Sequence, residues 1–505
     1  MTTHNYDVVV IGAGGSGLAA ALSSADAGVK VLVLERRPQP GGTTGIAVGS
    51  FTASETRFQA SAKIEDRVAW HAEDAGEFAD PDVEARNNDE LRRFFLENAA
   101  ETLHWLADFG LSFFGPSAEP PNRVARMHNV VPGAKAYIAR LQLELQKRRV
   151  PIWCDVQQVS LIRSDRCISG VRCRIDQSDV DIMASRGVVL AGGDYANNPE
   201  LIARFKGERF REIEGINTFA QGEGHLLAEQ AGAELVNMDV TYGPELRFIP
   251  SSRTPFQQWL PTSGLWSRLL GFVARRLPAS AMNWFIKRLL VTWQHPENAL
   301  LCDGAILVNQ AGQRFVNELQ WPDREVAVAA QPQKQAYLLL DRRLIERYSQ
   351  WPNFISTAPD IAYAYVADYE RLRPDVTVRA DDLAGVATAR GINPTSLQQT
   401  VEDYNRLRQS AQKCEFGRTV EQPLENGPWV LMGPLKAYFT TTEGGARIDQ
   451  HLRVLDAAGE PIPGLYAVGQ NGLGGMVLFG HGLHIAWAMT SGRLVGREFA
   501  SAEKP

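Results

Sequence analysis

The sequence predicts an α/β fold in which both ends of the chain contribute to one parallel sheet, with an α+β domain inserted between them. Three observations lead to this prediction. A strand–glycine–helix–strand pattern opens the chain, a buried strand at 186–190 runs into a glycine-rich turn, and a strand at 465–468 is followed by another glycine-rich turn and a final helix. Strands alternating with helices are typical of parallel sheets.

The first pattern occupies Tyr6–Arg37. A short apolar strand, Val8–Ile11, is followed by glycines, an alanine-rich helix at 18–27 and a second strand at 30–34. Two short apolar strands around one helix are the βαβ arrangement. The sequence therefore places a strand-to-helix turn directly after Ile11.

The glycines of this turn have the G-x-G-x-x-G spacing. Gly12 permits a tight turn, Gly14 lets a pyrophosphate approach the backbone, and Gly17 lets the helix pack closely on the sheet. The helix N-terminus directs free N–H groups at the phosphates. Glu35 ends the second strand, where an acid accepts hydrogen bonds from a ribose. The stretch thus predicts a Rossmann-like dinucleotide-binding domain.

Bulk composition narrows the class of protein. A chain of 505 residues with 44% hydrophobic and 22% charged residues predicts a globular protein of two or three domains. The net charge of −6 argues against a nucleic-acid partner. The five cysteines never form C-x-x-C, so we expect neither disulfides nor a structural metal. With no signal-peptide pattern and no long apolar run, we expect a cytoplasmic location.

Further elements follow along the chain. Apolar spacing predicts helices at 89–109 and at 132–149, and a strand from Ile152 to Val159. A final helix is expected at 483–497. The loop between the first two helices carries Arg126 and His128, for which a solvated position is the commoner case and a ligand contact the alternative.

Four segments resemble the fumarate reductase/succinate dehydrogenase flavoprotein superfamily. The chain has Gly41-Gly42-Thr43-Thr44 for the family's G-G-x-[ST] loop. The other three segments are 191–200 (AGGDYANNPE), 304–318 (GAILVNQAGQRFVNE) and 461–470 (PIPGLYAVGQ). The resemblance implies FAD as the cofactor. No histidine lies between His4 and His71, so we expect FAD to be bound non-covalently.

The resemblance also implies which residues contact FAD. They come from both ends of the chain and from the segment near 156 that lies under the adenine in this superfamily. The expected cofactor-binding residues are Gly12, Gly14, Gly15, Ser16, Gly17, Glu35, Arg36, Gly42, Thr43, Thr44, Ala47, Val48, Gly49, Val156, Gln157, Ala191, Gly192, Gly193, Gly469, Gln470, Gly482, Leu483 and Ile485.

The segment at 304–318 marks the inserted domain as the capping domain that closes over the flavin in this superfamily. We therefore expect the FAD-binding domain to be discontinuous, over 1–234 and 426–505, with the capping domain at 235–425.

The capping domain contains a basic, aromatic stretch at 265–293, which Pro278 divides into two amphipathic helices. Between Glu245 and Glu297 there is no acid, and there are seven bases. One interpretation is a peripheral contact with the anionic cytoplasmic face of a membrane. The other interpretations are a pair of cap helices packed on the core or on a second subunit, and an apolar entrance for a substrate drawn from the lipid.

Substrate-side positions depart from the patterns of known branches. Soluble fumarate reductases carry an arginine acid where this chain has Pro322, and a histidine where it has Thr441. Their carboxylate-binding arginine has no counterpart in 477–482. The tyrosines of 3-ketosteroid dehydrogenases are missing as well, with Leu478 at one place. The apolar replacements favour a hydrophobic ketone or enone over a dicarboxylate.

Two residues are candidates for proton transfer. Tyr242 begins the expected cap, and His481 lies in the turn beside the expected flavin. For each the alternative is structural: a packed aromatic ring with a satisfied hydroxyl, or a histidine that hydrogen-bonds the cofactor or backbone.

The sequence therefore predicts an FAD-dependent oxidoreductase. We expect it to act on a CH–CH or C=C bond beside the carbonyl of a small hydrophobic, 3-ketosteroid-like substrate, with quinone or another carrier as electron acceptor. Two alternatives remain: a fumarate- or urocanate-type ene-reductase, and a membrane-associated electron-transfer subunit that passes electrons to quinone.

Overall fold

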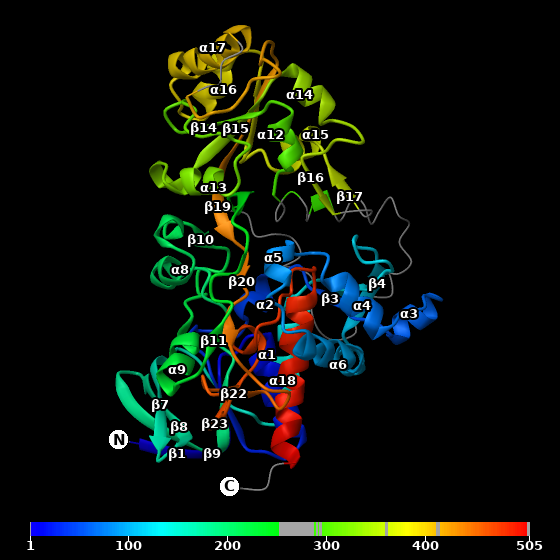
Figure 1. Cartoon of the computed structure of the whole chain (residues 1–505), viewed down its shortest axis with the longest axis vertical. Coiled ribbons are helices and arrows are strands. Elements are labelled where there is room, and N and C mark those ends of the chain that lie inside the picture. Colours follow the sequence, from blue (N-terminus) through cyan, green and yellow to red (C-terminus); the bar gives the residue numbers. More distant parts are fainter. Residues whose placement is uncertain are drawn as a thin grey trace.

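The computed structural model describes residues 2–251, 287, 288, 291, 295–358, 362–410 and 415–501. Two hydrophobic cores divide the described chain. One core lies around the large sheet near both termini, at the bottom of Figure 1, and the other lies in the cap at the top. The predicted α/β class is confirmed.

An eight-stranded sheet forms the base of the molecule. Its order is β22-β23-β9-β1-β2-β6, and β8 and β7 extend it beyond β9. Strand β1 is central and pairs in parallel with both neighbours: Val8 lies opposite Val31 of β2 and Gly187 of β9. Its strands are β1 (Thr2–Ile11), β2 (Val31–Leu34), β6 (Ile152–Trp153), β7 (Gln157–Ser164), β8 (Cys167–Ile175), β9 (Ser178–Leu190), β22 (Arg453–Leu455) and β23 (Pro461–Ala467).

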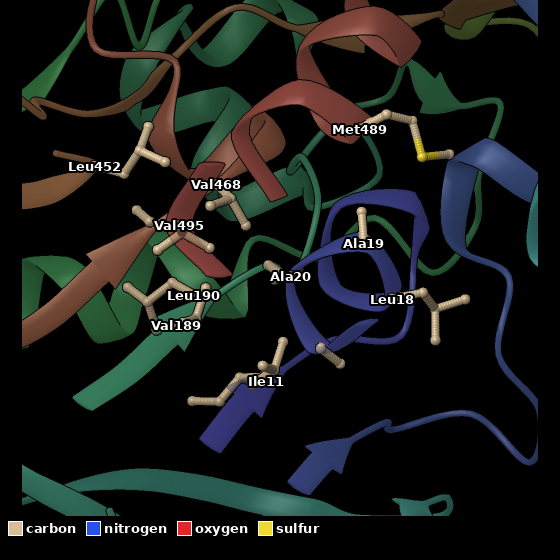
Figure 2. Close-up of a cluster of buried hydrophobic side chains, with 14 of the residues drawn as sticks. Ile11, Leu18, Ala19, Ala20, Val189, Leu190, Leu452, Val468, Met489 and Val495 are labelled. Carbon is tan, nitrogen blue, oxygen red and sulfur yellow. The ribbon is translucent and has the colours of Figure 1, made fainter. Parts of the chain in front are cut away.

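Helices α1 and α18, from opposite ends of the chain, pack side by side on this sheet (Figure 2). Two glycines of α18 allow the close approach: a Cβ on Gly492 would lie 2.3 Å from the Ser16 carbonyl oxygen, and one on Gly496 would lie 2.5 Å from Ser23 Cβ. The surrounding helices are α1 (Gly15–Asp26), α2 (Gly42–Ile46), α6 (Asp89–Asp108), α7 (Lys135–Lys147), α9 (Glu223–Ala231) and α18 (Leu483–Ser501).

The predicted helices at 89–109, 132–149 and 483–497 all form, with ends shifted by a few residues. Helix α6 is capped by Asn88, whose side chain accepts a hydrogen bond from Leu91 N. The predicted strand 152–159 differs, because it is divided into β6 and β7. Asp155, at φ +58°, lies between them. A positive φ bends the strand at that residue.

A three-stranded sheet, β3-β5-β4, stands beside α18. Arg126 and His128 adjoin or lie on β5 and are fully buried, which contradicts the solvated position expected for them. Arg126 makes ion pairs with Asp66 and Asp74, which compensate its buried charge. The elements of this region are β3 (Ser50–Thr52), β4 (Ser112–Ser117), β5 (Met127–Val131), α3 (Arg57–Ser61), α4 (Val68–Ala75) and α5 (Pro81–Glu84).

A second sheet of six strands forms the cap, with the order β10-β19-β15-β14 and with β13 and β18 also paired to β19. The long strand β19 continues down toward the base in Figure 1. The residues of β19 follow the predicted end of the capping domain at 425, yet they pair within the cap sheet. The domain boundaries themselves stay predictions. The strands are β10 (Glu214–Gly215), β13 (Glu245–Phe248), β14 (Ile306–Val308), β15 (Ala336–Leu340), β18 (Thr377–Ala380) and β19 (Trp429–Phe439).

Helices cover the cap sheet, and short ladders join the cap to the base. The helices are α8 (Pro199–Phe205), α12 (Asn298–Cys302), α13 (Asp323–Ala329), α14 (Arg342–Arg347), α15 (Val366–Leu372), α16 (Leu383–Ala389) and α17 (Pro394–Ser410). The ladders are β11 (Leu235–Val236) with β21 (Gly445–Ala446) and β12 (Thr241–Tyr242) with β20 (Thr441–Thr442). A further hairpin, β16 (Ser356–Ala358) with β17 (Ala362–Ala364), lies within the cap.

The basic amphipathic pair predicted at 265–293 lies outside the described residues, apart from Lys287, Arg288 and Val291. Lys287 makes an ion pair with Asp368 and lies over the ring of Tyr365, both in or next to α15. In the part of the chain that is described, no helix is long and apolar enough to cross a membrane.

Candidate FAD and substrate site

The strand-to-helix turn after β1 has the geometry of a phosphate cradle. Gly12 has φ +109°, and a Cβ there would lie 2.4 Å from the Ala191 carbonyl oxygen. A Cβ on Gly17 would lie 1.9 Å from the Gly12 carbonyl oxygen. Gly14 is different: its Cβ would meet only Gly42 Cα, at 3.8 Å. Two glycines are thus required by the fold, and Gly14 faces open space in front of the α1 N-terminus.

Glu35 and Arg36 follow β2 at the same edge. The buried Glu35 carboxylate accepts hydrogen bonds from Ala13 N at 2.8 Å and Arg37 N at 2.9 Å, so it is fixed beside the glycine turn. Arg36 makes an ion pair with Glu223 at the start of α9. It also donates to the Phe219 carbonyl oxygen at 3.0 Å. This edge can therefore present one fixed carboxylate and one anchored guanidinium to a nucleotide.

The second small-residue loop lies against the first. Gly42 opens α2 at φ +55°, directly beside Gly14. Asn217 Nδ2 donates to Thr43 Oγ1 at 2.9 Å, and Thr44 Oγ1 lies 2.6 Å from where a Cβ on Gly15 would be. The remaining predicted residues of this loop, Ala47, Val48 and Gly49, lie between α2 and β3.

The turn after β9 closes the other side. Gly192 N donates to Asn471 Oδ1 at 2.6 Å, and Asn471 Nδ2 donates to the Gly193 carbonyl oxygen at 2.9 Å. Asn471 also contacts His225 Nδ1, while His225 Nε2 donates to the Gly444 carbonyl oxygen at 2.9 Å. Burial lowers the pKa of His225 to about 4, so this residue of α9 is neutral and structural. Asn471, which the sequence analysis missed, ties the two turns together.

The remaining predicted cofactor residues surround the same space. Gly469 N donates to Ser491 Oγ at 2.9 Å, and a Cβ on Gly469 would lie 2.7 Å from Ser16 Oγ. Gln470 Nε2 donates to Thr441 Oγ1 at 2.6 Å. Ala191 directly follows β9, Val156 hydrogen-bonds to the Glu35 backbone, and Gln157 begins β7. Gly482, Leu483 and Ile485 lie at the start of α18. Glycine cradle, carboxylate and helix N-terminus together fit a dinucleotide such as FAD.

A cavity of about 530 Å³ lies between the cap and the turn that precedes α18. Among the described residues that line it, none belongs to the predicted FAD cradle. Aromatic rings form part of the wall: Phe78, Tyr242, Trp321 and Phe479. A pocket of this size is within the range of roughly 300–1,000 Å³ that is usual for small-molecule sites.

Tyr242, on β12, is the predicted catalytic residue that lines the cavity. Its ring packs edge-on against Phe479 at 5.3 Å between centroids. Burial raises the pKa of its hydroxyl to about 12, with a contribution from the charge of Glu245. At neutral pH Tyr242 is therefore a protonated hydrogen-bond donor.

His481, the other candidate, is held by Glu119 of the loop between β4 and β5. The Glu119 carboxylate makes an ion pair with His481 Nδ1 and accepts a second hydrogen bond from His481 N at 2.9 Å. The hydrogen bond to Glu119 raises the pKa of His481 above 6.5. The imidazole is 61% exposed, whereas Glu119 is buried. The imidazole is thus accessible, and its raised pKa favours the protonated form that can donate a proton.

Arg324 supplies a guanidinium that the sequence analysis missed. It lies on α13, two residues after Pro322, and lines the cavity. Its Nε donates to Glu325 Oε1 at 2.9 Å, and its Nη1 donates to the Glu318 carbonyl oxygen at 3.0 Å. The sequence feature that could have identified Arg324 is its position shortly after the R-F-V-N-E segment. The seven-residue helix α13 begins directly after Pro322 and places Arg324 at the cavity, so a cation is present although Pro322 occupies the expected position.

Two further ionisable residues, Glu245 and His295, line the cavity, and Arg247 lies next to Glu245. Glu245 pairs with Arg247 at 2.7 Å, and His295 Nδ1 lies 3.9 Å from Glu245. Burial lowers the pKa of His295 below 6.5, although the charge of Glu245 opposes the shift. His295 is therefore neutral at neutral pH and can accept or donate one hydrogen bond.

One family matches over most of the chain: the family described as FAD binding domain covers residues 7–257 and 271–479. The chain belongs to this FAD-binding family. It is an FAD-dependent oxidoreductase of the fumarate reductase superfamily, and the predicted superfamily and cofactor are confirmed.

Relatives of this flavoprotein are named as reductases. The NADH:fumarate oxidoreductase of Klebsiella pneumoniae (strain 342) is 28% identical over 92% of the chain and 44% of its own length. The fumarate reductase (cytochrome) of Shewanella frigidimarina is 26% identical over 99% of the chain and 77% of its own length. The vinyl phenol reductase of Lactiplantibacillus plantarum is 24% identical over 98% of the chain and 96% of its own length.

Solved structures support the fold of the flavoprotein. The open conformation of a flavocytochrome c3 fumarate reductase matches with a TM-score of 0.72 at 24% identity, over 98% of this chain and 78% of the other. A 3-ketosteroid delta1-dehydrogenase from Sterolibacterium denitrificans matches with a TM-score of 0.63 at 20% identity, over 99% and 100% of the two chains.

Proposed function

We propose that this flavoprotein reduces a carbon–carbon double bond conjugated with a carbonyl group in a hydrophobic, ring-bearing substrate. The observation that carries the proposal is the cavity between cap and base. It combines aromatic walls with the Tyr242 hydroxyl, and it lies beside the turn that holds His481. Bound FAD supplies the hydride, and the protein supplies the proton and the oxyanion stabilisation.

The shifted pKa values suggest a division of labour between the two candidates. Tyr242, whose pKa burial raises to about 12, suits hydrogen bonding to the carbonyl oxygen as negative charge develops there. His481, whose pKa the Glu119 hydrogen bond raises, suits proton delivery to the carbon next to the carbonyl. Arg324 lines the same cavity, but the Glu325 carboxylate compensates its charge.

The names of the relatives favour reduction over dehydrogenation. Dehydrogenation of a 3-ketosteroid-like compound is the second candidate, because the cavity volume and aromatic walls also suit a fused-ring ketone. An anaerobic screen decides between them. Enones and other alkenes conjugated with a carbonyl should reoxidise the reduced flavin, and saturated 3-ketosteroids should leave the oxidised flavin unchanged. Bleaching of the oxidised flavin by a ketosteroid would reverse the assignment.

We further propose a separate electron carrier, quinone or a redox protein, and a cytoplasmic location with peripheral membrane contact through residues 265–293. The relatives are named for different electron sources, NADH in one and a cytochrome in the other. Sedimentation with anionic vesicles, compared with neutral ones, tests the membrane contact. Equal recovery with both vesicles would contradict it.

We expect Tyr242→Phe and His481→Ala each to lower kcat about 10²- to 10⁴-fold, because each removes one group that handles a proton or the developing charge. Stopped-flow reoxidation of the reduced flavin measures the effect, and the flavin absorbance per protein shows that FAD is retained. Normal turnover in either variant would assign that residue a purely structural role.

We expect Glu119→Gln to move the basic limb of the pH–rate profile to lower pH. The hydrogen bond to Glu119 raises the pKa of His481 above 6.5, so the histidinium persists to higher pH in the wild type. Removing the carboxylate lowers this pKa, and the proton is lost earlier as pH rises. The matched control is Glu498→Gln, which removes the partner of surface His451. An unchanged basic limb in Glu119→Gln would show that His481 does not set it.

A further inference from the structure

An exposed aromatic ring stands at the nucleotide edge of the FAD cradle. Phe219 belongs to the loop at 216–222, which joins β10 to α9, and it is 46% exposed although it is apolar. Its ring packs against Arg37, whose Cζ lies 4.2 Å from the ring centroid. Arg37 N donates to the Glu35 carboxylate at 2.9 Å. The ring is therefore held on the segment that directly follows the predicted ribose ligand, and the proposed reaction does not use it.

Hydrogen bonds tie this loop to the cradle. Asn217 Nδ2 donates to Thr43 Oγ1 at 2.9 Å, and Asn217 Oδ1 accepts from Phe219 N at 3.1 Å. Arg36 donates from Nη2 to the Phe219 carbonyl oxygen at 3.0 Å and makes an ion pair with Glu223, the first residue of α9. The backbone of Phe219 is thus anchored at both its N–H and its carbonyl group, so the position of the ring is fixed.

The adenine of FAD belongs at the same edge. The pyrophosphate fits the open space in front of Gly14 and the α1 N-terminus, and Glu35 accepts hydrogen bonds from the ribose. Along the FAD molecule the adenine follows this ribose, and the flavin lies at the other end. The adenine therefore reaches the segment after Glu35, where Arg37 carries the ring of Phe219.

An aromatic ring supported by a guanidinium is a suitable surface for a purine. Nucleobases stack on aromatic side chains and on guanidinium planes, and this stacking requires no charge on the base. Arg37 covers one face of the Phe219 ring, and nearly half of the residue remains accessible. A stacked adenine would remove this apolar surface from water.

We propose that Phe219 stacks on the adenine of FAD and that the loop at 216–222 thereby slows release of the cofactor. In this arrangement Phe219 makes the contact, Arg37 positions its ring, and Asn217 positions its backbone. The proposal concerns retention of FAD, so it holds whichever bond the flavin reduces and does not rest on the proposed reaction.

The affinities of the apoprotein for FAD and for ADP test the proposal, because ADP carries the adenosine and both phosphates but no flavin. We expect Phe219→Ala to weaken the binding of both about 10- to 100-fold and to speed FAD dissociation by a similar factor. Phe219→Tyr keeps the ring and should bind both as the wild type does. Unchanged affinity for FAD in Phe219→Ala would overturn the proposal, and so would a loss for FAD without a loss for ADP.

A matched control removes an aromatic ring elsewhere. Trp351→Ala removes a ring that is 62% exposed in the cap, and both affinities should stay at the wild-type value. Because Phe219 is exposed, Phe219→Ala should leave the urea midpoint of the apoprotein unchanged. A lowered midpoint together with weaker binding would assign the ring to packing of the loop and overturn the proposal.

Arg37→Ala tests the support of the ring. Once the guanidinium is removed, Phe219→Ala should have little further effect on the affinity for FAD, because the two side chains act as one unit. Fully additive losses in the double variant would show that Arg37 does not position Phe219.

Discussion

Replacing Gly14 with alanine is expected to weaken FAD binding strongly while leaving the free energy of unfolding of the apoprotein nearly unchanged. Its φ of −77° suits any residue, and the new Cβ would meet only Gly42 Cα at 3.8 Å. The methyl group would, however, project into the space that the pyrophosphate needs. We expect the affinity for FAD to fall about 100-fold or more, which is about 2.7 kcal/mol. Titration of apoprotein with FAD measures it.

Gly17→Ala is the informative comparison. Its Cβ would lie 1.9 Å from the Gly12 carbonyl oxygen, so α1 must move away from β1. We expect a loss of roughly 3 kcal/mol in the free energy of unfolding of the apoprotein, because the clash is with backbone. If both variants lost stability equally and bound FAD equally, the distinction between a fold glycine and a ligand glycine would be wrong.

Glu318→Ala is expected to destabilise the cap by roughly 3–5 kcal/mol, because it leaves two buried guanidinium groups without their carboxylate. Glu318 is fully buried and accepts hydrogen bonds from Arg314, Arg418 and Leu307 N. Arg418 also holds the Leu301 carbonyl oxygen at 2.8 Å, so the carboxylate ties α12, β14 and the chain after α17 together. Urea unfolding followed by tryptophan fluorescence measures the loss.

The lowered pKa of Glu318 predicts that the free energy of unfolding decreases in acid. Burial alone raises the pKa of Glu318, but the hydrogen bonds and charges of Arg314 and Arg418 outweigh it and hold the pKa below 4.5. A lowered folded-state pKa stabilises the protein above pH about 4.5, and this stability is lost as pH falls through the folded-state pKa. Glu318→Gln should flatten this part of the stability curve. Asp403→Asn, which breaks an exposed pair with Arg406, should change stability by less than about 1 kcal/mol. A loss as large in the control would contradict the argument.

The fold and the cofactor were predictable because local chemistry determines them. Gly12 and Gly17 are required wherever a strand turns into a closely packed helix, so their spacing is visible in the sequence. The same holds for α6 and α18, whose apolar faces follow the helical period. Arg314 and Glu318 of the R-F-V-N-E segment form an ion pair at i and i+4, so both partners fall within one short sequence motif.

The candidate substrate site was only partly predictable, because tertiary structure assembles it. Glu119 is far in sequence from His481, and no local pattern indicates their contact. Arg324 was missed because the position expected for a cation holds Pro322, and only the helix that begins there shows where the next side chains lie. Arg126 was expected to be a solvated loop residue, but its side chain is buried and makes ion pairs with Asp66 and Asp74. Ion pairs between distant segments leave no periodic signal.

The packing of α18 on α1 has a consequence for biosynthesis. The glycine turn and α1 leave the ribosome early, but Ser491, which accepts a hydrogen bond from Gly469 N, and Gly492, which packs against Ser16, belong to α18 and are made much later. A nascent chain therefore exposes the face of α1 that packs on α18 until α18 has been made. We expect stable FAD binding only after that point, and an exposed apolar helix face favours aggregation before it.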